Sequence, residues 1–241
     1  MQHTSTKYQE LLASWNHQTE VKAVIGGIEY TMSDLKTLET ERHPFGTAKP
    51  TLGLAVSGEI TITAYLPVTT FARMSEINVF IRLTSETGSS EWLPKGTYYI
   101  DTREGDSSFV TIHGFDAMMK AEQPYANSTL EWPARDCDVV NEISAAIGVD
   151  VDERTWDVLT RQFPIQLPEQ YVSTDTDIGD YYTMRETLAG IAGLYGGSFI
   201  VNDIGKLQLI CPWNRPVETY YLIDELGNYI TVGGQRVYLG A

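Results

Sequence analysis

The sequence predicts an α+β protein that begins with a β-barrel and continues into a domain with helices. Between about residues 20 and 118, apolar and polar residues alternate, which is the period of a half-buried strand. Beyond that point, apolar residues recur every three to four positions, as on one face of a helix. We therefore expect an N-terminal arm with a helix at 1–19, a β-barrel domain at 20–118, an α+β domain of helix plus hairpin at 119–210, and a short C-terminal β-extension at 211–241.

The first expected element is a short amphipathic helix in the N-terminal arm. Its apolar residues follow the spacing i, i+3, i+4, i+7, and we expect this face to dock on another surface: Tyr8, Leu11, Leu12 and Trp15. A strand at 21–25, the pair Gly26-Gly27 and a strand at 28–31 then predict a β-hairpin, because paired glycines supply the positive φ of a two-residue turn.

Further strands are expected at 60–64 and 77–84, each with one apolar face. The inward residues of the second are predicted to be Ile77, Val79, Ile81 and Leu83. Segments 97–102 and 108–113 form another expected hairpin across the turn residues 103–106. These strands together predict a small barrel or sandwich.

The second half contains two expected helices. Asp136 is the predicted N-cap of the first, Gly148 its predicted left-handed end, and its apolar face is Val139, Val140, Ile143, Ala146 and Ile147. The second begins with a predicted capping box between Thr183 and Glu186 and ends at Gly196-Gly197, with Met184, Leu188, Ile191 and Tyr195 in its stripe.

Two glycines inside this second helix, Gly190 and Gly193, predict a close backbone approach by a neighbouring element. A hairpin at 198–201 and 206–210 is expected directly after the helix. In the C-terminal extension we expect strands at 220–223 and 229–232 around a turn at 224–228, and a further strand at 235–239.

Charge and composition exclude several functions. Seventeen basic against thirty-two acidic residues give a net charge of −15, which disfavours stable nucleic-acid binding. The N-terminus is polar and apolar runs are short, so we expect no signal peptide, no membrane insertion, and folding in a cytoplasm. Cys137 and Cys211 cannot form a disulfide framework and are expected to be core thiols.

A search for catalytic motifs predicts no catalytic, cofactor-binding or metal-binding residues. The motifs of metalloproteases, α/β-hydrolases and phosphate-binding loops do not occur. The four histidines are widely separated: His3, His17, His43 and His113. His113 alone lies in a predicted strand. We interpret it as structural rather than as a general base, because a single histidine without a catalytic partner does not indicate any particular reaction. The chain is therefore expected not to be an enzyme.

The most site-like stretch is the acidic segment Asp175–Asp180, with Glu186 eleven residues after Asp175. Calcium loops place oxygen ligands at such intervals, but their sixth residue is glycine, and here Asp180 has that place. Glu186 is also expected in the capping box. We therefore favour a solvated acidic loop over a calcium site.

Aromatic residues gather at the edges of the predicted segments: Trp92, Tyr98, Tyr99, Trp132, Trp156, Tyr181, Tyr182, Trp213, Tyr220 and Tyr221. Such rings fit a core, a subunit interface or a carbohydrate-binding surface. We favour core and interface over sugar binding.

Several ordered segments carry a family resemblance. They are residues 90–103 (SEWLPKGTYYIDTR), 114–120 (GFDAMMK), 183–188 (TMRETL) through Gly196-Gly197, and 205–207 (GKL). Across about residues 20–210, this series resembles the baseplate hub proteins of long-tailed bacteriophages, also called tail-associated or minor tail structural proteins, and the hubs of contractile injection particles.

The resemblance implies a tail-tube-like β-domain joined to an α/β domain, arranged as a homotrimeric ring that links the tail tube, or a distal tail protein, to a central spike or fibre. The expected location is the virion tail, assembled in the host cytoplasm. The family supplies no catalytic residues or cofactor. Because the sequence ends at Ala241, we expect neither a complete second barrel nor a fused peptidoglycan hydrolase. The net charge further suggests an acidic channel wall that repels passing DNA.

Two alternatives remain open at this point. An envelope-degrading tail enzyme would need a pair of acidic residues in a cleft. A carbohydrate-binding adsorption module would present Trp92, Trp132 or Trp213 as an exposed platform.

Overall fold

The computed structural model describes residues 4–47, 49–65, 71–105, 108–126, 128–159, 166–167 and 182–212, and four two-residue strands nearer the C-terminus. Residues up to Ile210 form one compact unit and residues from Cys211 onward form a second. In the second unit, β14 (Tyr220–Tyr221) pairs with β17 (Tyr238–Leu239), and β15 (Thr231–Val232) pairs with β16 (Gln235–Arg236). The turn predicted at 224–228 lies outside the described residues.

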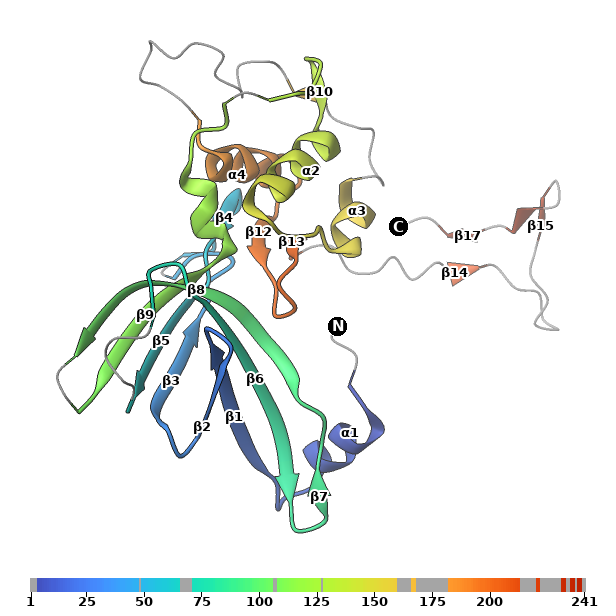
Figure 1. The fold of residues 1–241 in the computed structure, drawn as a ribbon. Helices are drawn as coiled ribbons and strands as arrows, with labels where there is room; N and C mark the ends of the chain where they lie inside the picture. The colour runs from blue at the N-terminus through green and yellow to red at the C-terminus, as the bar shows by residue number, and fades with distance from the viewer. Residues whose placement is uncertain are drawn as a thin grey trace. The chain divides into compact units, whose positions relative to one another are not determined.

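A curled antiparallel sheet, here called the large sheet, dominates the first unit (Figure 1). In the described chain its strand order is β2-β1-β6-β8-β9-β5-β3, with β7 added to β6. The strands are β1 (Gln18–Ile25), β2 (Ile28–Thr31), β3 (Leu35–Glu41), β5 (Glu59–Ala64), β6 (Glu76–Ser85), β7 (Gly88–Ser89), β8 (Leu93–Gly105) and β9 (Val110–Asp116). Both predicted hairpins of the first half are confirmed, because β1 pairs with β2 and β8 with β9. The predicted turn at 103–106 is wrong, since residues 103–105 belong to β8 and pair with β9.

Alternation along the strands builds the core inside the curl. Ile60, Ile62 and Ala64 are buried, as the sequence predicts, while the residues between them face outward. In β6 the prediction fails at Ile81, which is only half-buried. The register of β6 against β8 shifts between Val79 and Phe80, and this irregularity interrupts the alternation next to Ile81.

Strand β3 has no clear strand pattern in the sequence. Its residues LKTLETE include only two apolar side chains, Leu35 and Leu38, which pack partly buried against the core. Pairing with β5 over its whole length supplies the strand hydrogen bonds, with an irregularity between Leu35 and Thr37. The neighbouring strand therefore stabilises a segment whose own periodicity is weak.

The N-terminal helix α1 (Thr6–Ala13) contacts β6 (Figure 1). The hydroxyl of Ser5 accepts from the Tyr8 amide and caps the helix, while the Ser5 amide donates to the Glu91 carboxylate at 2.7 Å. The predicted four-residue apolar face is wrong. Only Leu11 is buried, and Trp15 is 100% exposed, because the helix ends at Ala13 and Ser14 already has an extended backbone.

A second layer combines a small sheet with helices. The small sheet has the order β13-β12-β4 and consists of β4 (Leu54–Val56), β12 (Ser198–Val201) and β13 (Leu207–Ile210). The hairpin β12–β13 is the predicted one, but the parallel pairing of β4 with β12 joins segments about 140 residues apart that no sequence pattern links. The helical elements are η1 (Ala117–Glu122), α2 (Asp136–Ile147), α3 (Glu153–Leu159) and α4 (Met184–Leu194); β10 (Ala134–Arg135) pairs with β11 (Gln166–Leu167).

Helix α2 agrees with the sequence except at its N-cap and at Ala146. Val139, Val140, Ile143 and Ile147 are buried and Gly148 is left-handed, but Ala146 is exposed. Arg135, not Asp136, is the N-cap, and it makes no side-chain capping bond. Asp136 is instead fully buried, where its carboxylate accepts from the Cys137 amide and from the Tyr195 hydroxyl.

Helix α4 has the predicted capping box, and one of its two interior glycines, Gly193, lies close to another backbone. Thr183 and Glu186 form the capping box. Gly193 lies against Gly53, the residue before β4: a Cβ built on Gly53 would be 3.2 Å from the Gly193 Cα. A Cβ on Gly193 would lie 3.6 Å from the Gly53 Cα, an ordinary contact, so the close approach of the two backbones constrains Gly53 more than Gly193.

We expect Gly53→Ala to lower the free energy of unfolding by about 2 kcal/mol, through a left-handed backbone and a tight contact with the Gly193 backbone. Gly148→Ala is the matched control, because both glycines have φ +75° but a Cβ at Gly148 meets nothing within 4 Å. Urea denaturation of both variants measures the difference. Equal losses would show that the Gly53–Gly193 approach contributes nothing to stability.

Candidate interaction groove

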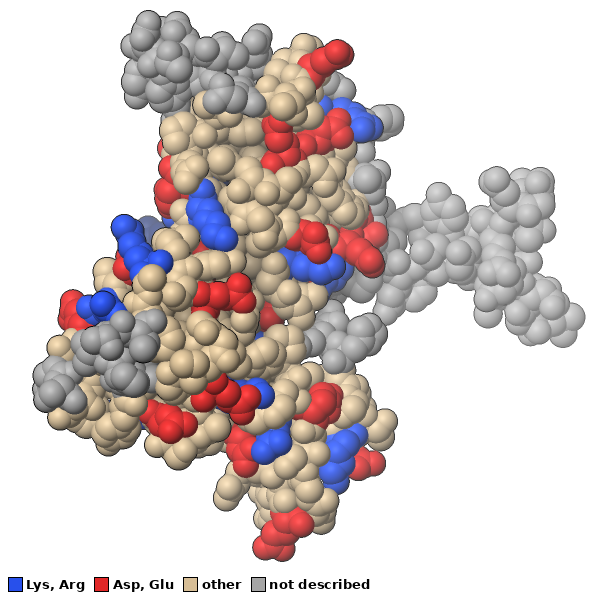
Figure 2. All heavy atoms as spheres, viewed as in Figure 1, with Lys and Arg blue, Asp and Glu red and all other residues tan. Residues whose placement is uncertain are grey.

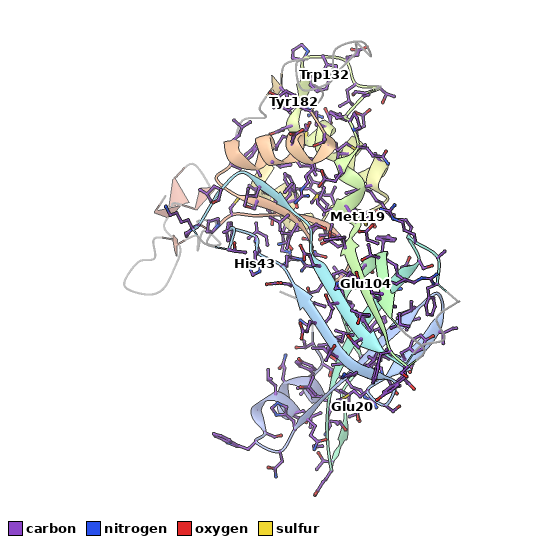
Figure 3. The ribbon with its side chains drawn as sticks, turned by 90° about the vertical axis from the view of Figure 1, so that its left-hand side faces the viewer. Glu20, His43, Glu104, Met119, Trp132 and Tyr182 are labelled. Carbon is purple, nitrogen blue, oxygen red and sulfur yellow. The ribbon has the colours of Figure 1, made fainter. Side chains whose placement is uncertain are left out.

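A cavity of about 720 Å³ opens where the large sheet meets the small sheet. We call it the groove. Figure 3 shows His43 and Met119, which both line it, at the level where the helical layer joins the large sheet. Its other lining residues include Glu41, Arg42, Leu54, Ala55, Val56, Glu59, Arg73, Asp101, Phe115, Glu122 and Arg185.

Three arginines line the groove, and each has a carboxylate partner. Arg73 pairs with Asp101 at 2.7 Å. Arg185, in the first turn of α4, donates to the carbonyl of Ala55 at 2.6 Å and pairs with Glu122. Arg42 pairs with Asp203 at 3.2 Å. These interactions hold the walls of the groove together and leave little basic charge for a ligand.

Arg42 also belongs to a network that joins the two sheets. Its Nη2 lies 3.9 Å from Asp116, whose side chain is 1% exposed at the end of β9. Asp203, in the β12–β13 turn, forms ion pairs with both Arg42 and Lys95, the second at 3.0 Å. The turn of the small sheet is therefore linked to the large sheet by charge pairs in which Asp116 and Arg42 are shielded from water, whereas Asp203 and Lys95 are partly exposed.

The Asp116 carboxylate is the buried centre of this network. It accepts from the Gly58 amide at 2.7 Å, the Met118 amide at 3.0 Å and the Ser57 hydroxyl at 3.1 Å. Burial raises the pKa of Asp116 to about 6, while these hydrogen bonds and Arg42 oppose the shift. No sequence pattern predicted the burial of Asp116, since an aspartate at a strand end is usually exposed.

The outer face of the large sheet forms the floor of the groove. Glu41 of β3 lies opposite Glu59 of β5, and Glu59 lies opposite Phe115 of β9. All three line the cavity, so two carboxylates and one aromatic ring form a row across three strands. Like charges directly opposite each other on a sheet are destabilising.

The predicted histidine and calcium candidates do not converge. His113 Nδ1 lies 3.1 Å from the Thr61 hydroxyl on the neighbouring strand, and His43 Nε2 lies 2.6 Å from Glu41. Glu186 is engaged with Thr183, whereas His3 and Asp175–Asp180 lie outside the described residues. Among the described residues, no three His, Cys, Asp or Glu side chains gather where a metal ion could bind.

The predicted aromatic residues have several different surroundings. Tyr98 is 2% exposed in the core, whereas Tyr182 is half exposed. The Trp92 ring is covered by Lys22 and Arg82, at 4.8 and 4.5 Å from its centre. The Trp132 indole nitrogen is buried, and Tyr181 and Trp213 lie outside the described residues.

The two thiols are less buried than the sequence suggests. Cys137 and Cys211 are both half-buried rather than core residues, and burial raises the pKa of each thiol. In the described part of the chain, no helix has the length and apolarity that a membrane crossing requires.

Similar solved structures include two tail proteins. One is the 43 kDa tail protein of prophage MuSo2 from Shewanella oneidensis, with 13% identity, 89% of this chain and 61% of that chain covered, and a TM-score of 0.47. The other is the tail protein from Neisseria meningitidis MC58, with 16% identity, coverage of 88% and 57%, and a TM-score of 0.49. The chain thus spans less than two thirds of each.

No family model and no curated protein matches the chain. Both TM-scores are below 0.5, so the similarity of folds does not by itself assign a role.

Proposed function

We propose that this chain is a structural component of the tail of a long-tailed bacteriophage or a phage-tail-like particle. In this proposal, copies assemble into a trimeric ring at the baseplate hub, between the tail tube or a distal tail protein and the central spike or fibre. The chain acts through its surfaces and not by converting a substrate. The proposal does not depend on the two similar structures.

The observation that carries the proposal is the pair of edges of the large sheet. Strands β2 and β3 end the sheet, and in the described chain neither pairs with a strand on its outer side. Exposed strand edges are templates for pairing with another chain. Ile28 in β2 and Met32 directly after it are 51% and 57% exposed, which adds apolar area beside one edge.

Two different edges on one subunit support head-to-tail assembly. When edge β3 of one copy meets edge β2 of the next, the contact is heterologous, and such contacts form a closed ring if the rotation between subunits closes. The acidic and basic side chains on the face seen in Figure 2 are spread over it rather than gathered into one patch. That distribution is compatible with contacts made by strand edges instead of by one charged surface.

The surroundings of the tryptophans support this role over the carbohydrate-binding alternative. A sugar platform needs an open aromatic face, but the Trp92 ring already has two cations over it, and the nitrogen of Trp132 is buried. An envelope-degrading enzyme remains the other alternative, and zymography of the purified chain on bacterial cell walls tests it directly. Clearing of the cell wall would contradict a purely structural role.

The main test is the mass of the assembly in solution. We expect multi-angle light scattering to detect a closed oligomer and cryo-electron microscopy to place the chain in a tail. Thr37→Lys adds a charge at the exposed edge of β3 and should shift the assembly toward monomers, whereas Asn141→Lys, on the exposed side of α2, should not. A chain that is monomeric at all concentrations and absent from tails would overturn the proposal.

A further inference from the structure

Cations of the same chain lie over four half-buried aromatic rings, two in strands of the large sheet (Phe80 and Tyr99) and two in the segments between strands (Trp92 and Phe109). Lys22 is 5.6 Å from the centre of Phe80, and Lys36 is 4.5 Å from that of Phe109. Lys120 lies 3.7 Å from the centre of the Tyr99 ring, and Trp92 has the two cations already described. Cation–aromatic contact is therefore a repeated feature of this surface.

Phe115 is different. It is the direct cross-strand neighbour of Tyr99, and its ring is half-buried on the outer face of β9. Among the residues that the structure describes, no Lys or Arg lies over the Phe115 ring. Within that part of the chain, Phe115 therefore lacks the kind of cation contact that its neighbour Tyr99 makes with Lys120.

The acidic side chains beside Phe115 are only partly neutralised by cations of the described chain. Glu59, the neighbour of Phe115 on β5, has no ion pair or hydrogen bond with another described side chain, and it lies opposite Glu41. Among the described side chains, Glu41 is the hydrogen-bond partner of the His43 imidazole. The three arginines of the groove are engaged with Asp101, Glu122 and Asp203. A cation placed between Glu59 and Phe115 would relieve the repulsion between the two glutamates and lie against the ring.

The opposite wall of the groove is apolar and ends in a strand edge. Leu54 and Val56 of β4 face the cavity together with Met119 of η1. Strand β4 ends the small sheet, and within the described ranges only β12 pairs with it. This wall suits a short extended segment with apolar side chains.

We propose that the groove binds an extended segment of a neighbouring protein, whose Lys or Arg side chain lies between Glu59, Glu41 and the Phe115 ring and whose adjacent apolar residues contact Val56 and Met119. The net charge of −15 favours such a basic segment by electrostatic attraction. The inference uses the proposed tail role only to name the neighbour as another tail component. The binding site itself can be tested with the isolated chain.

The probe is a surface-displayed library of random seven-residue peptides, selected on the full 241-residue chain. We expect Lys or Arg at one position, flanked by apolar residues, to be enriched at least fivefold. The same selection on a Glu59→Gln, Phe115→Leu double variant should lose this enrichment. Glu86→Gln, in the exposed turn between β6 and β7, removes one charge far from the groove and should keep it. No enrichment with the unsubstituted chain would overturn the proposal.

Fluorescence anisotropy of the enriched peptide then measures the contribution of its cation. Replacing its Lys or Arg by norleucine should weaken binding about tenfold with the unsubstituted chain and less than twofold with Glu59→Gln. Circular dichroism checks that each variant is folded. Equal binding of both peptides would contradict the proposal, and so would self-association that disappears with Glu59→Gln, because a second copy would then occupy the groove. Ring formation is measured separately by light scattering, so a negative result in the peptide experiments would not contradict the proposed function.

Discussion

Replacing Asp116 by Ala is expected to lower the free energy of unfolding by about 3–4 kcal/mol. The substitution removes the acceptor for two buried amides: that of Gly58, between β4 and β5, and that of Met118, in η1. It also removes a carboxylate near Arg42, whose side chain is only 16% exposed. Two buried backbone donors would then lack their acceptor, and Asp203 would be the remaining carboxylate partner of Arg42; unsatisfied buried donors are among the costliest losses in proteins.

Asp101→Ala is the matched control for this prediction. Asp101 also pairs with an arginine at the groove, but Arg73 is 73% exposed, so the pair lies in water and its loss should cost less than about 1 kcal/mol. Urea denaturation followed by circular dichroism measures both variants. If the two losses were equal, the Asp116 network would have no special role in joining the sheets.

The stability of the protein should also depend on pH through Asp116. Its folded-state pKa of about 6 lies above the ordinary value of 3.8, so between these values the folded chain keeps a proton that the unfolded chain has released. The contribution of Asp116 to stability is therefore largest below about pH 4 and falls as the pH rises to about 6. A shift of about two units corresponds to a loss of about 3 kcal/mol across this window.

The comparison with Asp116→Asn isolates this effect, because asparagine has a similar size and does not titrate. Other acids oppose the trend: hydrogen bonds lower the pKa of Asp34 and Glu186, and a hydrogen bond from Arg154 lowers that of Asp152. From pH 4 to pH 7, the unfolding free energy of the unsubstituted protein should fall by about 3 kcal/mol relative to that of Asp116→Asn. A difference that stays constant with pH would show that Asp116 does not change its protonation in this range.

The sequence predicted the parts of the fold that depend on neighbours along the chain. The Gly26-Gly27 turn lies between β1 and β2, and the capping box at Thr183 begins α4, because both need only residues a few positions apart. Helix α3 was missed, since it has seven residues and buries only Thr155 and Leu159. The proposed homotrimer, the hub position and the absence of enzymatic activity stay predictions.

The features of the groove could not be predicted in the same way. Glu41, Glu59 and Phe115 are up to 74 positions apart, and only the pairing of β3, β5 and β9 makes them one row. Trp15 was expected to pack with the helix but is exposed, because the cap at Ser14 turns the chain before Trp15. No local pattern distinguishes Asp116 from the other acidic residues.

By itself the sequence determined the strand and helix periods, the turns, the caps and the large negative charge, because each depends on short-range geometry or on composition. Only the tertiary structure decided that β4 joins β12, that Asp116 is buried next to Arg42, and that Glu59 and Phe115 lie in one groove with no described cation over the ring. Those arrangements depend on contacts between segments far apart in the chain, whose register is fixed by the burial of the whole core and not by any one segment.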